Sequence, residues 1–135
     1  MSRLIRILTL TMVLVTMLLV AVTSTVLAAD EIDIVVSPNV LNIGSNSLYA
    51  HIHADIGYVA DADTTVEVNG TEVQNIDTFA DDCGNLVIKF DIGQVKDMMT
   101  SDGSDLANFI LSYCSSDGEY IGKDSVPVIR TLKNP

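Results

Sequence analysis

The chain of 135 residues carries 7 Lys and Arg against 18 Asp and Glu, which gives a formal net charge of −11. This balance argues against nucleic acid and anionic lipid surfaces as partners, because both are bound through basic patches. Trp is absent and aromatic residues make up 5% of the chain. The composition therefore also disfavours an aromatic sugar-binding platform.

The N-terminal segment has the three parts of a secretory signal peptide. Arg3 and Arg6 form a positive start, Ile7–Val22 is uncharged and mostly apolar, and Val26–Ala28 supplies small or medium residues for a signal peptidase. We expect residues 1–28 to be the signal, with cleavage directly after them or one residue later. Loss of the two arginines leaves five Lys and Arg against 18 acids, a net charge of −13.

An uncleaved membrane anchor is the alternative for the same segment. The uncharged run Ile7–Ala29 has 23 residues, which is enough to span a bilayer. The polar Thr23–Thr25 and the small residues after it favour cleavage instead. We therefore expect a secreted or cell-surface protein that has no membrane contact once the signal is removed.

Residues 29–130 are predicted to form one domain of about seven short strands and almost no helix, followed by a tail at 131–135. Turn residues recur at spacings of about ten, as in an antiparallel β-sandwich. One short helix is expected at Gly93–Met99, where Val95, Met98 and Met99 have helical spacing. A kinked edge segment is expected at Val40–Ile43. The predicted strands are Asp30–Val36, Ser47–Ile56, Thr64–Val68, Ile76–Ala80, Leu86–Phe90, Leu106–Cys114 and a last strand made of Tyr120–Gly122 and Ser125–Arg130, interrupted at Gly122.

Two stretches carry most of this prediction. In Leu86–Phe90 apolar residues alternate with Val87 and Lys89, the pattern of a half-buried strand. Ser47–Ile56 is the longest alternating run, with Leu48, Ala50, Ile52, Ala54 and Ile56 on one face and Tyr49, His51, His53 and Asp55 on the other. Pro127 in the last strand indicates an edge position.

Asn69-Gly70 lies between two alternating runs, and this pair is a strong hairpin signal because both residues tolerate positive φ. Asn69-Gly70-Thr71 is also a glycosylation sequon. An exposed hairpin tip is compatible with both roles, and the turn is the favoured reason for the pair.

The two cysteines, Cys83 and Cys114, favour a disulfide in an exported domain. Cys83 comes just before one predicted strand, and Cys114 ends another. If these two strands are antiparallel, the cysteines lie at the same end of the sandwich. Cys114 has the opposite parity to Phe109, which moves the expected bond to the rim.

From Leu86 onward the chain resembles an Ig-like module of secreted and surface proteins of archaea and bacteria. The resemblance rests on Val87–Asp91 (VIKFD), the helix at Val95–Met99, Asp117–Asp124 (DGEYIGKD) and Val126–Ile129. It implies an Ig-like sandwich that does no chemistry of its own. Many such modules have a calcium-like Asp-rich turn before the key strand, and here that turn is reduced to Asp81–Asn85.

His51 and His53 are the two histidines of the chain, and their i, i+2 spacing places them on one face of a strand. With Tyr49 and Asp55 beside them, two imidazoles and a carboxylate would be three zinc ligands. The favoured interpretation is a polar outer face, because H-x-H alone is common and no further ligand is fixed by spacing.

Asp61 and Asp63 form half of a calcium-loop pattern, but the chain then continues into a strand and no glutamate closes the loop. A solvated acidic loop is favoured. No catalytic nucleophile, nucleotide fingerprint or phosphate-binding glycine loop is found. We predict no catalytic residue, no cofactor and no metal site.

The sequence thus favours an exported, non-catalytic Ig-like module with a recognition, adhesion or cell-envelope role and a protein or glycan partner. One alternative is a cation-dependent carbohydrate- or protein-binding module, and another is a small metal-dependent enzyme that uses His51 and His53. The loops Gly57–Asp63, Thr100–Ser104 and Ser115–Gly118 are expected to carry recognition, because loops on a rigid sandwich commonly do.

Overall fold

The computed structural model describes residues 2–20 and 28–131. Helix α1 (Ser2–Val20) covers the apolar part of the predicted signal. In the described part of the chain, no helix is long and apolar enough to cross a membrane. Most of the predicted cleavage region and the last four residues of the predicted tail lie outside the described residues, so cleavage stays a prediction.

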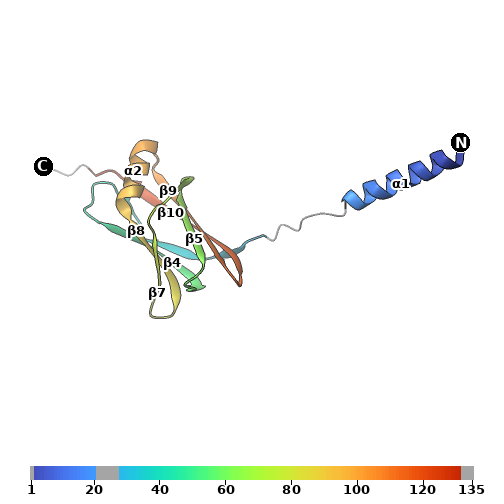
Figure 1. Ribbon diagram of the computed structural model, residues 1–135. Helices are drawn as coiled ribbons and strands as arrows, with labels where there is room; N and C mark the ends of the chain where they lie inside the picture. Colours follow the sequence, from blue (N-terminus) through green and yellow to red (C-terminus); the bar gives the residue numbers. More distant parts are fainter. Residues whose placement is uncertain (1, 21–27, 132–135) are drawn as a thin grey trace.

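The strands form two sheets packed face to face (Figure 1). Sheet A has the order β1-β10-β9-β5-β6, with β3 also paired to β10, and sheet B has the order β2-β4-β8-β7. In the lettering of Ig domains, sheet B holds strands A, B, E and D, which are β2, β4, β8 and β7, and sheet A holds strands C, F and G, which are β5, β9 and β10. This is the strand order of a constant-type Ig sandwich. The strands are β1 (Asp30–Ile32), β2 (Ile34–Ser37), β3 (Leu41–Asn42), β4 (Tyr49–Gly57), β5 (Asp63–Val68), β6 (Thr71–Glu72), β7 (Asp77–Ala80), β8 (Asn85–Asp91), β9 (Leu106–Ser115) and β10 (Gly118–Ile129).

The core lies between the two sheets and follows the predicted alternation. Ile52 and Ile88, which are register partners in β4 and β8, are fully buried, as are Val66 and Leu111 in β5 and β9. Burial of these aliphatic side chains is the main driving force for the fold, at about 1.5–3 kcal/mol for each. The predicted all-β sandwich is therefore confirmed as an architecture.

The first predicted strand, Asp30–Val36, is divided between the two sheets. β1 pairs in parallel with β10 of sheet A, whereas β2 pairs antiparallel with β4 of sheet B. The crossing passes so close to Gly122 that a Cβ there would lie 2.4 Å from Ile34 Cγ2. Asp124 accepts a hydrogen bond from the backbone N–H of Val36 through Oδ2, at 2.9 Å. Gly122 and Asp124 of the Ig-like motif therefore fix the crossing between sheets.

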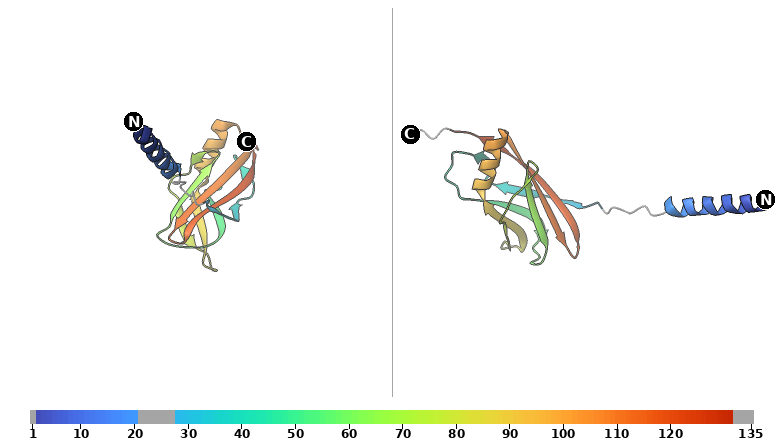
Figure 2. Two further views of the ribbon diagram at one scale, coloured as in Figure 1. Left: turned by 90° about the vertical axis from the view of Figure 1, so that its right-hand side faces the viewer. Right: turned by 45° about the horizontal axis from the view of Figure 1, so that its top comes forward.

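Helix α2 (Ile92–Asp102) is longer than the predicted Gly93–Met99 and includes most of the predicted loop Thr100–Ser104. The Asp91 carboxylate caps its start by accepting from Gly93 N at 2.7 Å. Gly103 ends it in the left-handed conformation, with φ 68°, the usual way in which a helix terminates at glycine. Ile92, Val95 and Met99 are its buried residues. Figure 2 shows α2 at one end of the sandwich.

Three local predictions need correction. β10 is continuous through Gly122, because β9 pairs with it without a break from Gly118 to Pro127. Pro127 is not on an outer strand, because β1 and β3 both pair with β10 on the side away from β9. The Pro127 nitrogen faces the gap between those two strands. The N–H of the neighbouring Val128 points the other way and donates to Asp105 O, beside β9. Leu48 was expected in the core but is 70% exposed, since β4 begins one residue after it.

Candidate recognition site

The sandwich has two ends that differ in composition. The first, called here the entry end, comprises residues 30–33, 55–63, 81–85 and 114–121, and β1 starts there. The opposite end, called the α2 end, comprises residues 42–48, 69–75, 91–106 and 129–131. Figure 1 shows the β7–β8 and β9–β10 turns at the lower end and α2 at the upper end. The ladders confirm the grouping, since Asp30 pairs with Tyr120 and Gly57 with Asn85.

Charge is distributed unequally between the ends. The entry end contains ten of the 18 acidic residues and no Lys or Arg. The described basic residues of the sandwich, Lys89, Lys96, Lys123 and Arg130, all lie outside it. The entry end is therefore a concentrated source of negative potential. Its acids are Asp30, Glu31, Asp33, Asp55, Asp61, Asp63, Asp81, Asp82, Asp117 and Glu119.

A hollow of about 150 Å³ opens at the entry end between the β4–β5 loop and the β9–β10 hairpin. We call it the tyrosine hollow, because three of the four tyrosines of the chain line it. Its lining residues are Ile56, Gly57, Tyr58, Val59, Tyr113, Ser115, Asp117 and Tyr120. Two of the three loops predicted to carry recognition therefore meet in one concave site.

Tyr113 fixes one wall of the tyrosine hollow to the other. Its ring is buried, and its hydroxyl accepts from Val59 N at 2.8 Å and donates to Gly57 O at 3.2 Å. The two bonds connect β9 to the last residue of β4 and to the loop after it, and the N–H of Tyr58 donates to Gly84 O at 2.9 Å. The loop is thus held in place without help from a ligand.

Tyr120 packs its ring against the core but leaves its hydroxyl available in the hollow. Its ring lies 6.4 Å from that of Tyr113, centroid to centroid, in a tilted arrangement. Among the described residues its hydroxyl has no hydrogen-bond partner. Gly118 has φ 145°, and a Cβ there would lie 3.8 Å from the Tyr120 hydroxyl oxygen. The site therefore presents an aromatic face and a free hydroxyl beside the exposed Asp117.

His51 and His53 lie side by side on the outer face of sheet B, as predicted, with ring centroids 6.4 Å apart. Their register partners in β8 are Lys89 and Val87. Partial burial lowers the pKa of His51, and the neighbouring His53 and Lys89 lower it further. Within the described residues, no three His, Cys, Asp or Glu side chains are grouped so that they would hold a metal ion.

The predicted acidic loop positions have ordinary structural surroundings. Asp61 is in the turn before β5, and Asp63 is the first residue of β5, opposite Cys114. Asp81 closes the β7–β8 turn, where Oδ1 accepts from Cys83 N at 2.8 Å and from Asn85 N at 2.9 Å. This is the normal use of an aspartate in a tight turn.

The predicted Cys83–Cys114 disulfide is not formed: both thiols are free and exposed. The cysteines are at the same end of the sandwich, as expected, but they belong to different sheets. Tyr113 points into the core, so Cys114, the next residue along β9, points out of sheet A and away from the β7–β8 turn. The parity noted in the sequence is the physical reason for the correction.

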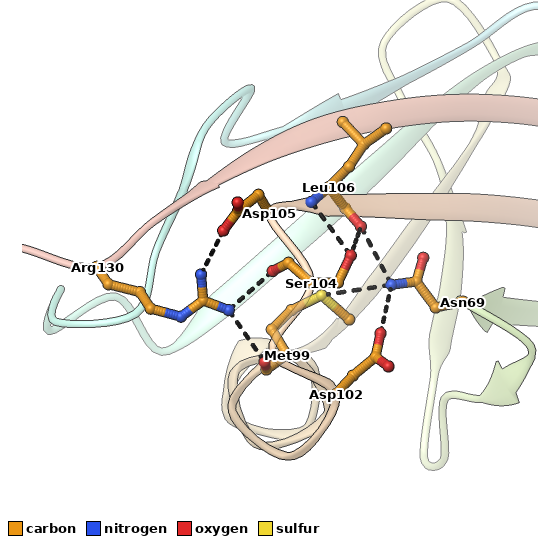
Figure 3. A network of polar contacts seen from close by, with 7 residues as sticks. All are labelled: Asn69, Met99, Asp102, Ser104, Asp105, Leu106 and Arg130. Carbon is orange, nitrogen blue, oxygen red and sulfur yellow. Dashed lines mark hydrogen bonds and ion pairs between the residues drawn. The ribbon is translucent and has the colours of Figure 1, made fainter.

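The α2 end is tied together by side chains, and Asn69 is central to it (Figure 3). The Asn69 amide nitrogen donates to Leu106 O at 3.1 Å and to Asp102 Oδ2 at 3.3 Å, while its oxygen accepts from Asn108 N at 2.8 Å. With φ 49°, Asn69 and Gly70 form the predicted turn. We call these hydrogen bonds of the Asn69 side chain with β9 and α2 the latch. Glycosylation would modify the same amide nitrogen, so the latch competes with it.

Arg130 completes the network in Figure 3 from the other side. Its guanidinium forms an ion pair with Asp105 at 2.7 Å and donates to Ser104 O at 2.8 Å and to Met99 O at 3.2 Å. A second hollow, of about 290 Å³, lies beside Asn69, Thr71 and the last turns of α2. Asn69 and Asp102 at its wall already bind each other, and this end lacks the concentrated charge of the entry end, which makes it the weaker candidate for recognition.

The sequence pattern indicates the loops of the tyrosine hollow but not its side chains. The alternation in Leu106–Cys114 places the Tyr113 ring on the core face of its strand, where the structure has it, but it indicates no role for the hydroxyl. Tyr120 is predicted as the start of the last strand and as the aromatic position of the DGEYIGKD motif, which indicates no place in a binding site. The available signal was the position of this aromatic two residues after the Asp-Gly turn, which places it at the rim of a hairpin.

Comparisons with known proteins leave the chain without an assigned family. No family model and no curated protein matches it. Among solved structures, the PKD domain of human KIAA0319 aligns with 84% of this chain and 94% of its own length, at 12% sequence identity and a TM-score of 0.37. The Ig-like assignment made above rests on the strand order of the two sheets.

Proposed function

We propose that this chain is an exported, non-catalytic Ig-like module that acts by recognition through the entry end of its sandwich. The tyrosine hollow is the observation that carries the proposal. Its walls are fixed by the hydrogen bonds of Tyr113, so little ordering entropy is lost when a partner enters. Its lining combines aromatic rings with a few polar groups, as binding sites commonly do.

Export is supported by the order of features at the N-terminus, where Arg3 and Arg6 stand at the start of an apolar helix. Protein recovered from outside the cytoplasm is expected to begin at Ala29 or Asp30 by intact-mass measurement. Retention of Met1 in that protein supports the anchor instead.

A photo-crosslinking series tests the recognition surface. A photoreactive residue replaces Ser116 in the β9–β10 turn or, as a matched control, Ser112 on the outer face of the same hairpin. A single adduct of defined mass is expected from position 116 and not from position 112. Equal yields at the two positions reject the entry end as the recognition surface.

A panel of ester, glycoside, phosphoester and peptide substrates tests the non-catalytic part. We expect no turnover by the purified chain. Hydrolysis that disappears in the His51→Ala/His53→Ala variant contradicts the proposal and supports the metal-dependent enzyme.

A further inference from the structure

Two hollows of appreciable size lie at the ends of the sandwich, and of these two the tyrosine hollow has the stronger surrounding charge. The α2-end hollow is larger, at about 290 Å³, but Asn69 and Asp102 at its wall bind each other. The outer face of sheet B combines His51, His53 and Lys89 with exposed Val35 and Phe79, but nothing in the structure indicates what would cover it.

The size of the tyrosine hollow limits its occupant. Pockets for drug-sized ligands have volumes of about 300–1,000 Å³, and this hollow has about half of the lower limit. A cavity of about 150 Å³ holds a group the size of benzene. A single planar side-chain head therefore fits, and the remainder of the ligand lies outside the hollow.

The lining specifies the chemistry of that group. Tyr58 and Tyr120 contribute aromatic rings, and the Tyr120 hydroxyl and the Asp117 carboxylate can accept hydrogen bonds. Ser115 Oγ already accepts from Asp117 N at 3.3 Å, and its second lone pair can accept one more bond. A guanidinium is planar, stacks on aromatic faces and donates to several acceptors at once. Ile56 and Val59 line the same hollow and suit the apolar stem of an arginine.

The charge around the hollow agrees with this chemistry. The entry end has ten acids and no Lys or Arg, so a cationic group is attracted from a distance and an anionic one is repelled. Asp117 is at the rim and exposed, so it would pair with the guanidinium without the cost of burying a carboxylate.

We propose that the tyrosine hollow binds an arginine side chain presented by a basic segment of a partner protein. This proposal rests on the proposed recognition function and adds the chemical class of the partner. Tyr120 and Tyr58 stack on the guanidinium, Asp117 and the two hydroxyls accept its hydrogen bonds, and the surrounding acids accelerate encounter.

The test measures binding of fluorescent octapeptides to the purified full chain by fluorescence anisotropy. The probes are an alternating Arg-Gly peptide, an alternating Lys-Gly peptide of equal charge and an alternating Glu-Gly peptide. We expect the Arg peptide to bind about tenfold more tightly than the Lys peptide, because stacking adds to charge. Binding of the Glu peptide is expected to be undetectable.

Matched variants separate the hollow from general electrostatics. Asp117→Asn and Asp97→Asn remove the same charge, the first at the hollow and the second on α2. Asp117→Asn and Tyr120→Ala are each expected to weaken Arg-peptide binding about tenfold, and Asp97→Asn to leave it nearly unchanged. Tyr120→Phe, which keeps the ring, is the fallback if Tyr120→Ala unfolds, and it is expected to weaken binding by less.

Equal loss of binding in Asp117→Asn and Asp97→Asn overturns the proposal, because it shows non-specific attraction. Absence of Arg-peptide binding also overturns it, as does binding of calcium or of a neutral tetrasaccharide that depends on Tyr120. A surviving crosslink at position 116 then shows that recognition stands and that the arginine assignment alone has failed.

Discussion

The two ends of the sandwich are stabilised in different ways. At the α2 end, Asn69, Lys96 and Arg130 connect separate elements through side-chain hydrogen bonds. At the entry end the long-range side-chain hydrogen bonds come from one residue, Tyr113, and the remaining contacts are mainly backbone bonds and short-range turn bonds from Asp81 and Ser115. At the α2 end, therefore, polar side chains are occupied by hydrogen bonds that stabilise the fold.

Charge follows the same division. Three of the five acids at the α2 end have structural partners: Asp91 caps α2, Asp102 contacts Asn69 and Asp105 pairs with Arg130. At the entry end ten acids lie together without a Lys or Arg, and this arrangement costs stability through mutual repulsion. This arrangement supports the recognition role that we propose for the entry end.

The largest effect that we predict is at the α2 end. Asn69→Ala removes hydrogen bonds to Leu106 O and from Asn108 N and places Ala at φ 49°. We expect a loss of about 2–3 kcal/mol in the free energy of unfolding, at about 1 kcal/mol for each bond plus the conformational cost. Urea denaturation measures it.

Two controls make the Asn69 experiment specific. Thr71→Ala destroys the glycosylation sequon but leaves the latch, and it is expected to change stability by less than about 0.5 kcal/mol. Asn69→Gly removes the side chain and tolerates positive φ, so its loss should be smaller than that of Asn69→Ala. If Thr71→Ala destabilises as much as Asn69→Ala, the latch is not the source of the effect.

The next effect is at the entry end. Tyr113→Phe keeps the buried ring and removes the hydroxyl that contacts Val59 N and Gly57 O. A loss of about 1 kcal/mol is expected, together with faster amide exchange at Val59. Tyr120→Phe is the matched control, because its hydroxyl has no partner among the described residues, and it should leave stability unchanged. An equal loss in both variants contradicts the proposed role of Tyr113.

The sequence allowed the layers of this fold to be predicted and left the fine structure of both ends open. Alternation in Ser47–Ile56 and Leu86–Phe90 indicated β4 and β8, because a buried face imposes a period of two. The division of Asp30–Val36 between two sheets was not predictable, because it depends on the close approach of Ile34 to Gly122. The entry-end hollow was equally hidden, since Tyr113 and Tyr120 meet only after β9 and β10 pair.

A smaller effect is the dependence of stability on pH that is caused by His51, on the outer face of sheet B. The pKa of His51 is lowered in the folded protein by burial and then by His53 and Lys89. The unfolded chain, with a His pKa of about 6.5, then binds more protons, so stability falls as the pH falls from 6.5 through the folded pKa. His51→Gln is expected to reduce this fall between pH 7.5 and 5. An unchanged urea midpoint difference between the two pH values contradicts it.

The last prediction is the absence of an effect, and it tests the comparison of the two ends directly. Cys83 is in a turn of sheet B and Cys114 points out of sheet A. Packed sheets lie about 10 Å apart, whereas a disulfide needs Cα atoms within about 7 Å. Both thiols should therefore react with a thiol reagent in the absence of reductant, and a reductant should leave the melting temperature unchanged. A mass short of two hydrogens and a melting temperature lowered by reductant would instead show a covalent bond at the entry end. The entry end would then be the more constrained of the two, and the contrast between an end tied together by many side chains and an end tied by few would be reversed.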